Sequence, residues 1–328
     1  MKSMQSVKGL LATLALLLAP LWCGAQGTWT PNKPIRLIVT YAPGGSADVL
    51  ARILQIPMGE ALGVPIVVDN RAGGAGNTGT EAVARAAPDG YTIGIGAVST
   101  HAINPALFGA KLPFKVPQDF TAISHLVNQP NVLLVHPSVP ATNMKEFVEW
   151  ARKNPALASF GTAGVGSSNH LTGELLNTRY GIQLVHVAYK SGGLALSDLT
   201  AGHIKIVIDN ISTAANLVES GKARAIGVST IRRSARLPNV QTFAEQGAPG
   251  FDLSSWQGLF APAGLPEPVL RRLNEAAVQA LKVPAVHARL EELGAEVVGS
   301  SPQDFTAFVA AELPKWGTLV RGSKMTIE

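Results

Sequence analysis

The chain has 328 residues, of which 46% are hydrophobic and 15% are charged, a balance that excludes a disordered chain. Its formal net charge is +5 and no run of Lys or Arg exceeds a pair, so we predict no nucleic-acid partner. Cys23 is the only cysteine, which excludes disulfide bonds within the chain.

Residues 1–25 have the pattern of a secretory signal peptide. Lys2 and Lys8 precede an apolar run over 10–18, and small residues follow up to Ala25. The apolar run is about half of the roughly 20 residues that span a bilayer, so a permanent membrane anchor is the weaker interpretation. We predict that cleavage after Ala25 releases the mature protein into the periplasm.

Cys23 lies inside the predicted signal peptide, so the mature chain has no thiol and no thiolate metal site or cysteine nucleophile. Lipid attachment to Cys23 is the alternative. Lipoprotein signals require a small residue directly before the cysteine, whereas this chain has the bulky Trp22 there. The pattern therefore favours simple cleavage.

Strand-like and helix-like stretches alternate in the first part of the mature chain. Three strands are predicted from their β-branched residues, over 35–39, 65–69 and 91–98. Helices are expected after Ser46 and over 82–87, and we expect Ser46 to cap the first helix and Pro57 to kink or end it. The alternation predicts a parallel sheet built from βαβ units.

The same alternation resumes after Pro130. Further strands are predicted over 132–135, 159–162, 183–187, 204–208 and 223–228. Asn143 with Glu146 three residues later is a capping-box pattern, which predicts the start of a helix. From Pro268 the sequence is mostly helical, with helices expected over 269–281, 285–293 and 302–320 and a short strand near 296–298.

These elements predict an α/β protein with two lobes, each a mostly parallel sheet flanked by helices. Lobe 1 is expected to contain residues 26–129 and 258–328, because the helical tail is too small for a sheet of its own. Lobe 2 is expected to contain residues 130–257, and the chain crosses between the lobes near 128–130 and 254–259. No Pro- or Ser-rich linker is present, so the lobes are expected to be closely hinged.

Two segments, 41–46 and 161–168, each combine a strand end, glycines, hydroxyl side chains and a helix start. A helix start exposes unpaired N–H groups with a partial positive charge, which suits a carboxylate or phosphate. Glycine lets the backbone approach such a ligand closely. If the lobes face each other, both helix starts converge on one anion. Composition leaves open the alternative of two ordinary βα turns.

Other glycine and histidine patterns give no support for a cofactor or a metal. The loop 74–79 has the spacing of a dinucleotide-binding fingerprint, but the next strand ends at 97–100 without the acid that binds the ribose. No phosphate-binding loop or nucleophile elbow occurs, and no histidines stand at a metal-binding spacing. We therefore predict no cofactor, no metal site, no catalytic residue and no enzymatic activity.

Two further polar features have two interpretations each. His170 follows the second glycine loop, where it either contacts a ligand or packs its helix. Asp209 and Asn210 end an apolar strand, where they either orient a polar group of a ligand or cap the next helix.

The sequence is similar to a known family over nearly the whole mature chain. The matching stretches occur in family order at 41–48, 69–74, 87–92, 112–114, 119–120, 164–174, 186–190, 209–210, 224–228, 237–240, 255–258 and 261–264. They resemble the substrate-binding proteins of tripartite tricarboxylate transporters, also called the Bordetella uptake gene family. Ala42 stands where this family commonly has a proline, and Ser191 where a glycine usually follows the lysine.

The resemblance implies a type II periplasmic-binding-protein (Venus flytrap) fold that closes over a ligand in the cleft between its lobes. It implies that backbone N–H groups of 43–46 and 162–168 hold a ligand carboxylate and that Asp209 lies near a polar substituent. The ligand-binding residues that we predict are Tyr41, Ala42, Gly44, Gly45, Ser46, Asp48, Ser99, Thr162, Gly164, Gly166, Ser167, Ser168, His170, Tyr189 and Asp209.

The predicted function is capture of a small carboxylate, an organic acid or amino acid, for the membrane components of a tripartite tricarboxylate transporter. The protein is expected to be a monomer in the periplasm. Two alternatives stay open, a ligand-sensing subunit of a membrane receptor and a periplasmic enzyme that acts on a small organic acid.

Overall fold

The computed structural model describes residues 28–323, 325 and 326. The predicted signal peptide, its cleavage site and Cys23 lie outside these residues. None of the helices in the described part combines the length and the apolar character that crossing a membrane requires.

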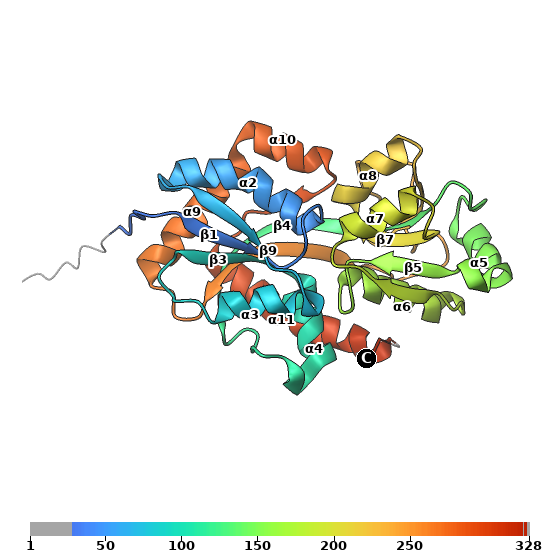
Figure 1. Ribbon diagram of the computed structural model, residues 1–328, viewed down its shortest axis with the longest axis horizontal. Helices are drawn as coiled ribbons and strands as arrows, with labels where there is room; N and C mark the ends of the chain where they lie inside the picture. Colours follow the sequence, from blue (N-terminus) through green and yellow to red (C-terminus); the bar gives the residue numbers. More distant parts are fainter. Residues whose placement is uncertain (1–27, 324, 327–328) are drawn as a thin grey trace, which may run out of the picture.

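The first lobe is built on a parallel core of three strands, in which β1 (Ile35–Val39) lies between β2 (Ile66–Asn70) and β3 (Thr92–Ala97). Two long strands, β9 (Ser254–Pro262) and β4 (Phe120–Val135), and the short β10 (Glu296–Val297) extend it in antiparallel fashion. In Figure 1, α2 (Ser46–Leu62), α9 (Glu267–Lys282) and α10 (Pro284–Glu292) cover one face of this sheet. On the other face lie α3 (Asn77–Ala84), α4 (Asn104–Phe108) and α11 (Pro302–Gly322).

The second lobe repeats this mixed arrangement. Its parallel strands are β5 (Ser159–Thr162), β6 (Val185–Ala188) and β7 (Ile206–Asn210), while β7 and β8 (Arg224–Val228) each pair antiparallel with β4. Its helices are α5 (Met144–Lys153), α6 (Ser168–Tyr180), α7 (Gly192–Thr200) and α8 (Ile211–Glu219). The two-lobed α/β fold is confirmed, with parallel outer strands and antiparallel pairing around β4 in both lobes.

The two lobes share β4, which continues from one sheet into the other, as Figure 1 shows. Residues Phe120 to Pro130 pair with β9, and residues Asn131 to Val135 pair with β7. The sequence predicted only the last four residues of this strand. The lobe boundaries at 129/130 and 257/258 stay a proposal, which the change of partner after Pro130 supports.

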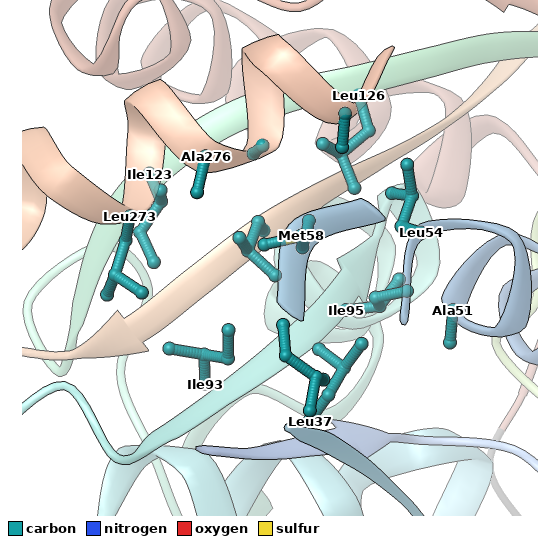
Figure 2. Packing of buried hydrophobic residues seen from close by; sticks show 14 of the residues in the cluster. Leu37, Ala51, Leu54, Met58, Ile93, Ile95, Ile123, Leu126, Leu273 and Ala276 are labelled. Carbon is teal, nitrogen blue, oxygen red and sulfur yellow. The ribbon is translucent and has the colours of Figure 1, made fainter. Parts of the chain in front are cut away.

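The core of the first lobe explains why its helices form where they do. Leu54 and Met58 of α2 pack with Leu37 of β1, Ile95 of β3 and Leu273 of α9, as Figure 2 shows, and each is at most 1% exposed. Buried apolar area of this kind contributes roughly 25 cal/mol per Å². The C-terminal helices therefore belong to the core of the first lobe.

The structure contradicts two details expected for α2, an end at Pro57 and a cap at Ser46. The helix does not end at Pro57 but continues to Leu62, because Met58 and Leu62 beyond the proline are buried in the same core as Leu54. Ser46 is not the capping residue, since the N-cap position is Gly45 and no side chain caps the helix. By contrast, the Asn143 side chain accepts a hydrogen bond from the Glu146 N–H at 3.0 Å, which confirms the predicted start of α5.

Candidate functional site

A small cavity of about 30 Å³ lies where the two lobes meet. The ends of four parallel strands supply much of its lining, with Tyr41 after β1, Ser99 after β3, Ala163 after β5 and Asp209 in β7. In open α/β sheets, ligands bind at this carboxyl edge of the strands. The topology thus places the cavity where such a fold binds its ligands.

Four helix N-termini surround this inner cavity. Its lining includes Gly45 to Ala47 at the start of α2, Ser167 to Asn169 at the start of α6, Gly192 at the start of α7 and Asn210 before α8. Each helix start carries roughly half a positive elementary charge. The inner cavity is therefore a favourable place for an anion even though no Lys, Arg or His is among the residues that line it.

The helix starts leave several backbone donors unpaired. Within the part of the chain that the structure describes, the N–H groups of Ser46, Ala47, Ser168, Asn169 and Gly192 have no hydrogen-bond partner, although all five residues line the cavity. The first N–H groups of a helix have no partner within the helix itself and need a side chain, water or ligand. These donors can hold a carboxylate.

The first glycine loop is held in shape by Asp48, a buried residue of α2. Its carboxylate accepts hydrogen bonds from the Gly44 N–H and from Arg52 at 3.0 Å each, and from Asn70 at 3.0 Å. Burial raises the pKa of Asp48, but these hydrogen bonds outweigh burial and keep its pKa below the usual value. Asp48 does not line the cavity, and the Gly44 N–H is already occupied.

The second glycine loop is held together by its own side chains. The Thr162 hydroxyl accepts a hydrogen bond from the Gly164 N–H at 3.1 Å, and the Ser167 hydroxyl accepts one from the His170 N–H at 3.1 Å as the N-cap of α6. His170 Nδ1 accepts a longer hydrogen bond from the Gly166 N–H at 3.4 Å. The free donors of this loop are therefore at Ser168 and beyond, not at its glycines.

Several contacts join the lobes around the cavity. The Ser46 hydroxyl donates a hydrogen bond to Asn210 Oδ1 at 3.0 Å and accepts one from Gln257 Nε2 of β9 at 2.8 Å. The Ala42 N–H donates to the Lys190 carbonyl at 3.2 Å. A Cβ at Gly193 would lie only 2.6 Å from the Gly44 carbonyl oxygen. The lobes are thus in a closed arrangement.

Asn131 is the centre of a buried polar network at the point where β4 enters the second lobe. Its side-chain oxygen accepts hydrogen bonds from Asn169 at 3.0 Å and Asn210 at 2.9 Å, and its side-chain amide donates to Thr172 at 2.9 Å. Asn131 is fully buried, where an unpaired amide would be costly. It therefore fixes Asn169 and Asn210 relative to the strand that joins the lobes.

Tyr41 lies at the boundary between the inner cavity and a larger outer pocket of about 770 Å³. Its hydroxyl shares a hydrogen bond of 2.7 Å with Ser99, and burial raises its pKa to about 12 although that bond opposes the shift. Tyr41 and Ala163 line both spaces. The inner cavity holds about two water molecules, so a larger ligand has to extend toward the outer pocket.

Two histidines on the second-lobe side of the outer pocket stack on each other. The rings of His170 and His186 have centroids 3.7 Å apart, and His186 shares a 2.7 Å hydrogen bond with Thr162. Burial lowers the pKa of His170 to about 3, with a smaller contribution from His186, and it lowers the pKa of His186 to about 4. Both rings are therefore neutral at pH 7.

Asp209 is the acidic residue of the inner cavity. It is 1% exposed, and its carboxylate accepts a hydrogen bond from the Thr213 hydroxyl at 2.7 Å. Burial raises its pKa to about 6, against the opposing effect of hydrogen bonds from Thr213 and the Asn210 backbone. A carboxyl group thus lies among donors that favour a negative charge.

The predicted site residues fall into three groups. Seven line the inner cavity: Tyr41, Gly45, Ser46, Ser99, Ser167, Ser168 and Asp209. Gly164, His170 and Tyr189 line the outer pocket, where the Tyr189 hydroxyl donates to Asp198 at 2.8 Å. Ala42, Gly44, Asp48, Thr162 and Gly166 line neither space and lie in or beside the loops that do. The assignment of a ligand to these residues stays a prediction.

The structure adds cavity residues that the sequence prediction did not include. Helix α7 begins at Gly192 within Ser191-Gly192-Gly193, which repeats the combination of glycine and hydroxyl found in the other two loops and was a usable signal. Asn169 and Gln257 carried no such signal, because only the fold brings them to the cavity. Among the described residues, no group of His, Cys, Asp and Glu side chains is arranged to hold a metal ion.

Comparison with known proteins places this arrangement in context. Residues 50–325 match the family described as tripartite tricarboxylate transporter family receptor. The solved structure of the periplasmic binding protein BugD is 32% identical, with a TM-score of 0.87 over 91% of this chain and 100% of that chain.

Two of the similar solved structures contain carboxylates. MatC from Rhodopseudomonas palustris with bound malate is 33% identical, with a TM-score of 0.85 over 88% of this chain and 99% of MatC. A second R. palustris protein with adipate is 34% identical, with a TM-score of 0.85 over 89% of this chain and 97% of that protein.

Proposed function

The chain belongs to the tripartite tricarboxylate transporter family of receptors, and we propose that it captures a small carboxylate in the periplasm for a membrane transporter of this type. One observation carries the proposal. The starts of α2, α6 and α7 contribute unpaired backbone N–H groups to a cavity whose lining contains no cationic side chain. This arrangement recognises a carboxylate through the backbone.

The site uses both lobes, which couples binding to closure. The start of α2 belongs to the first lobe and the starts of α6 and α7 to the second, so only a closed arrangement brings all donors to one anion. A ligand that contacts both lobes favours the closed state by the difference in its affinity for the two states. Closure is therefore the signal that a bound ligand gives to the membrane components.

We infer that the ligand carboxylate occupies the inner cavity while the rest of the molecule extends past Tyr41 into the outer pocket. The inner cavity of about 30 Å³ is too small for a whole organic acid, whereas the outer pocket of about 770 Å³ is in the usual range for a small-molecule site. The malate and adipate bound by similar proteins are acids of this kind.

The proposal includes passive binding without turnover, release of the mature protein into the periplasm and action as a monomer. The family membership supports the periplasmic location, because the similar BugD is a periplasmic binding protein. Mass-spectrometric determination of the mature N-terminus tests the predicted cleavage after Ala25. Incubation of the protein with each acid, followed by NMR of the solution, tests the absence of turnover.

A thermal-shift screen of the mature protein against malate, adipate, other mono-, di- and tricarboxylates and amino acids tests the binding function. A ligand present at 100 times its Kd stabilises the folded state by about 2.7 kcal/mol, which raises Tm measurably. Neutral amides and esters of the same acids are the matched controls and are expected to leave Tm unchanged. A screen in which no acid raises Tm would contradict the proposal.

A further inference from the structure

The inner cavity contains one feature that simple anion capture does not require. Asp209 and Tyr41 are the titratable residues of its lining, and Asp209 is the acidic one. A carboxylate ligand held by the helix starts therefore shares a water-poor cavity with a second carboxyl group. Two ionised carboxylates at such a site repel each other, which disfavours double ionisation.

The surroundings of Asp209 hold it in this position. Its carboxyl group packs directly on Gly192 at the start of α7, where a Cβ would lie 2.1 Å from Oδ1. The Thr213 hydroxyl of α8 fixes Oδ2 at 2.7 Å. These two contacts hold Oδ1 and Oδ2 in place beside the start of α7.

The charged groups on the neighbouring elements do not neutralise Asp209. On α2, Asp48 pairs with Arg52 at 3.0 Å and lies outside the cavity lining. On α7, Asp198 accepts a hydrogen bond from Tyr189, and on α8 the acidic residue is Glu219 at the far end, paired with Arg236.

The remaining titratable groups nearby face the outer pocket and not the inner cavity. They come from α6 and from the segment before α7, and they are His170, Glu174, His186, Tyr189 and Lys190. On β4, the residues paired with Asn210 and Asp209 are the uncharged Asn131 and Val132. No cation among the described residues lines the inner cavity beside Asp209.

We propose that a carboxylate ligand enters the inner cavity together with one proton, which Asp209 holds and donates in a hydrogen bond to the ligand. This inference rests on the proposed function. The proton comes from hydronium or a buffer acid in the solvent, and the O–H bond of the Asp209 carboxyl group is the only bond that forms on the protein. In the closed arrangement, before any effect of a ligand, burial already raises the pKa of Asp209 to about 6, so the protonated state is readily reached. A bound anion raises this pKa further, because it disfavours the ionised form.

The sign of the pH dependence follows from this linkage. Below about pH 5 Asp209 is protonated in both the free and the bound state, so Asp209 contributes no pH dependence there and only the ligand's own carboxyl groups do. Above the pKa of Asp209 in the free protein, the free protein loses this proton while the complex keeps it, so Kd for a carboxylate rises about tenfold for each further pH unit. An affinity that falls from pH 5.5 to pH 7.5 is the expected signature.

Isothermal titration calorimetry of the mature protein tests the proposal with L-malate and adipate at pH 5.5, 6.5 and 7.5. Each titration is repeated in buffers with different ionisation enthalpies, because the dependence of the heat on the buffer gives the number of protons taken up. We expect uptake close to one proton at pH 7.5 and much less at pH 5.5. If the acid binds at pH 7.5 without uptake of a proton, this inference is wrong, whereas the proposed binding function still stands.

Two variants assign the proton to Asp209. Asp209→Asn carries a permanent N–H donor, so its affinity is expected to be independent of pH. Thr213→Val removes the hydrogen bond that favours the ionised form, so the rise in Kd is expected to move to higher pH. The control Glu60→Gln, at an exposed position on α2, is expected to keep the wild-type profile. A wild-type profile in both Asp209→Asn and Thr213→Val contradicts the proposal.

L-aspartate separates the proposal from its main competitor, since it differs from L-malate by an ammonium group in place of the hydroxyl. If Asp209 stays ionised and pairs with a ligand cation, aspartate binds more tightly than malate at pH 7.5 without proton uptake, and the proposal is wrong. Preference for malate with proton uptake supports it. An absence of heat with all three acids at every pH contradicts the proposed function as well.

Discussion

The two glycine loops that face the cavity have similar sequences but are stabilised in different ways. The second loop, 162–168, pairs the N–H groups of its two glycines within its own lobe, through Thr162 and His170, and Ser167 caps the helix that follows. The first loop, 42–46, relies on Asp48 and on contacts that cross to the hinge strand and to the other lobe. The second loop is therefore preformed, whereas the hydroxyl of Ser46 in the first loop reaches its partner Asn210 only when the lobes close.

The largest effect is expected from a side chain that both distorts the second glycine loop and prevents the two lobes from closing. Gly166 has a φ of +77°, and its Cβ would lie 2.2 Å from Asn104 Oδ1 of the first lobe. Gly166→Val is expected to weaken ligand binding at least about 100-fold and to destabilise the fold by about 1–2 kcal/mol through backbone strain. Calorimetric titration and urea unfolding measure the two effects.

Gly45→Val is the matched change in the first loop. Its φ of −82° is allowed for any residue, and its Cβ would lie 3.4 Å from Ser191 Cβ across the interface. We expect Gly45→Val to lose ligand binding without the backbone strain of Gly166→Val. The control Gly322→Ala, whose Cβ meets no atom within 4 Å, is expected to change neither affinity nor stability. Wild-type affinity in a folded Gly166→Val variant would mean that the second loop does not contact the ligand.

Acid pH is expected to destabilise the second lobe through its histidine pair. Because burial lowers the pKa values of His170 and His186 to about 3 and 4, these rings stay neutral in the fold but take up protons near pH 6.5 when unfolded. Stability is therefore full above pH 6.5 and falls by up to about 1.4 kcal/mol per pH unit for each ring on acidification toward pH 4.

Urea unfolding at pH 7, 6 and 5 measures this dependence. His186→Gln is expected to reduce the slope by the contribution of one ring, while His101 and His125, whose pKa values burial also lowers, keep their part of it. His287→Gln, at a half-exposed position on α10, is the control and is expected to keep the wild-type slope. Equal slopes in all three proteins would show that the stacked pair is not the source.

A methyl group at the lobe interface tests the effect of lobe closure on binding without straining the backbone of a glycine loop. Gly193 is a helical residue of α7, and its Cβ would meet the backbone carbonyl of Gly44 in the other lobe at 2.6 Å. Gly193→Ala is expected to weaken ligand binding about tenfold or more with little change in the Tm of the free protein, because the lobes can separate. Unchanged affinity would indicate that the ligand-bound state is more open.

The smallest effects are expected from the two loop serines. One variant should mainly lower ligand affinity and the other should mainly lower the stability of the fold. Ser46→Ala removes one hydrogen bond to Asn210 of the other lobe and one to Gln257 of β9, of about 0.5–1.5 kcal/mol each, so ligand affinity should fall up to about tenfold with stability nearly unchanged. Ser167→Ala removes the N-cap of α6, so stability should fall by about 1 kcal/mol. Titration and unfolding of both variants test this reciprocal pattern, and equal effects on affinity would contradict it.

Local sequence patterns were sufficient for most elements but not for two long-range features. The strands around Leu37 and Phe160 and the cap at Asn143 follow from nearby residues alone. The full length of β4 was missed, because only its last residues form an uninterrupted apolar run. The continuation of α2 past Pro57 was also missed, because burial of Met58 and Leu62 in a distant core outweighs the local effect of proline.

The amino-acid sequence by itself determined the α/β class, the two glycine loops and the absence of cysteine from residue 26 onward, because each depends on residues close together in the chain. Only the tertiary structure decided which donors of those loops are free. Asp48 occupies the Gly44 N–H and His170 the Gly166 N–H, whereas the N–H groups of Ser46 and Ser168 face the cavity unpaired. It also added the start of α7 and the carboxyl group of Asp209 to one cavity, since packing of two lobes places groups that local chemistry cannot connect.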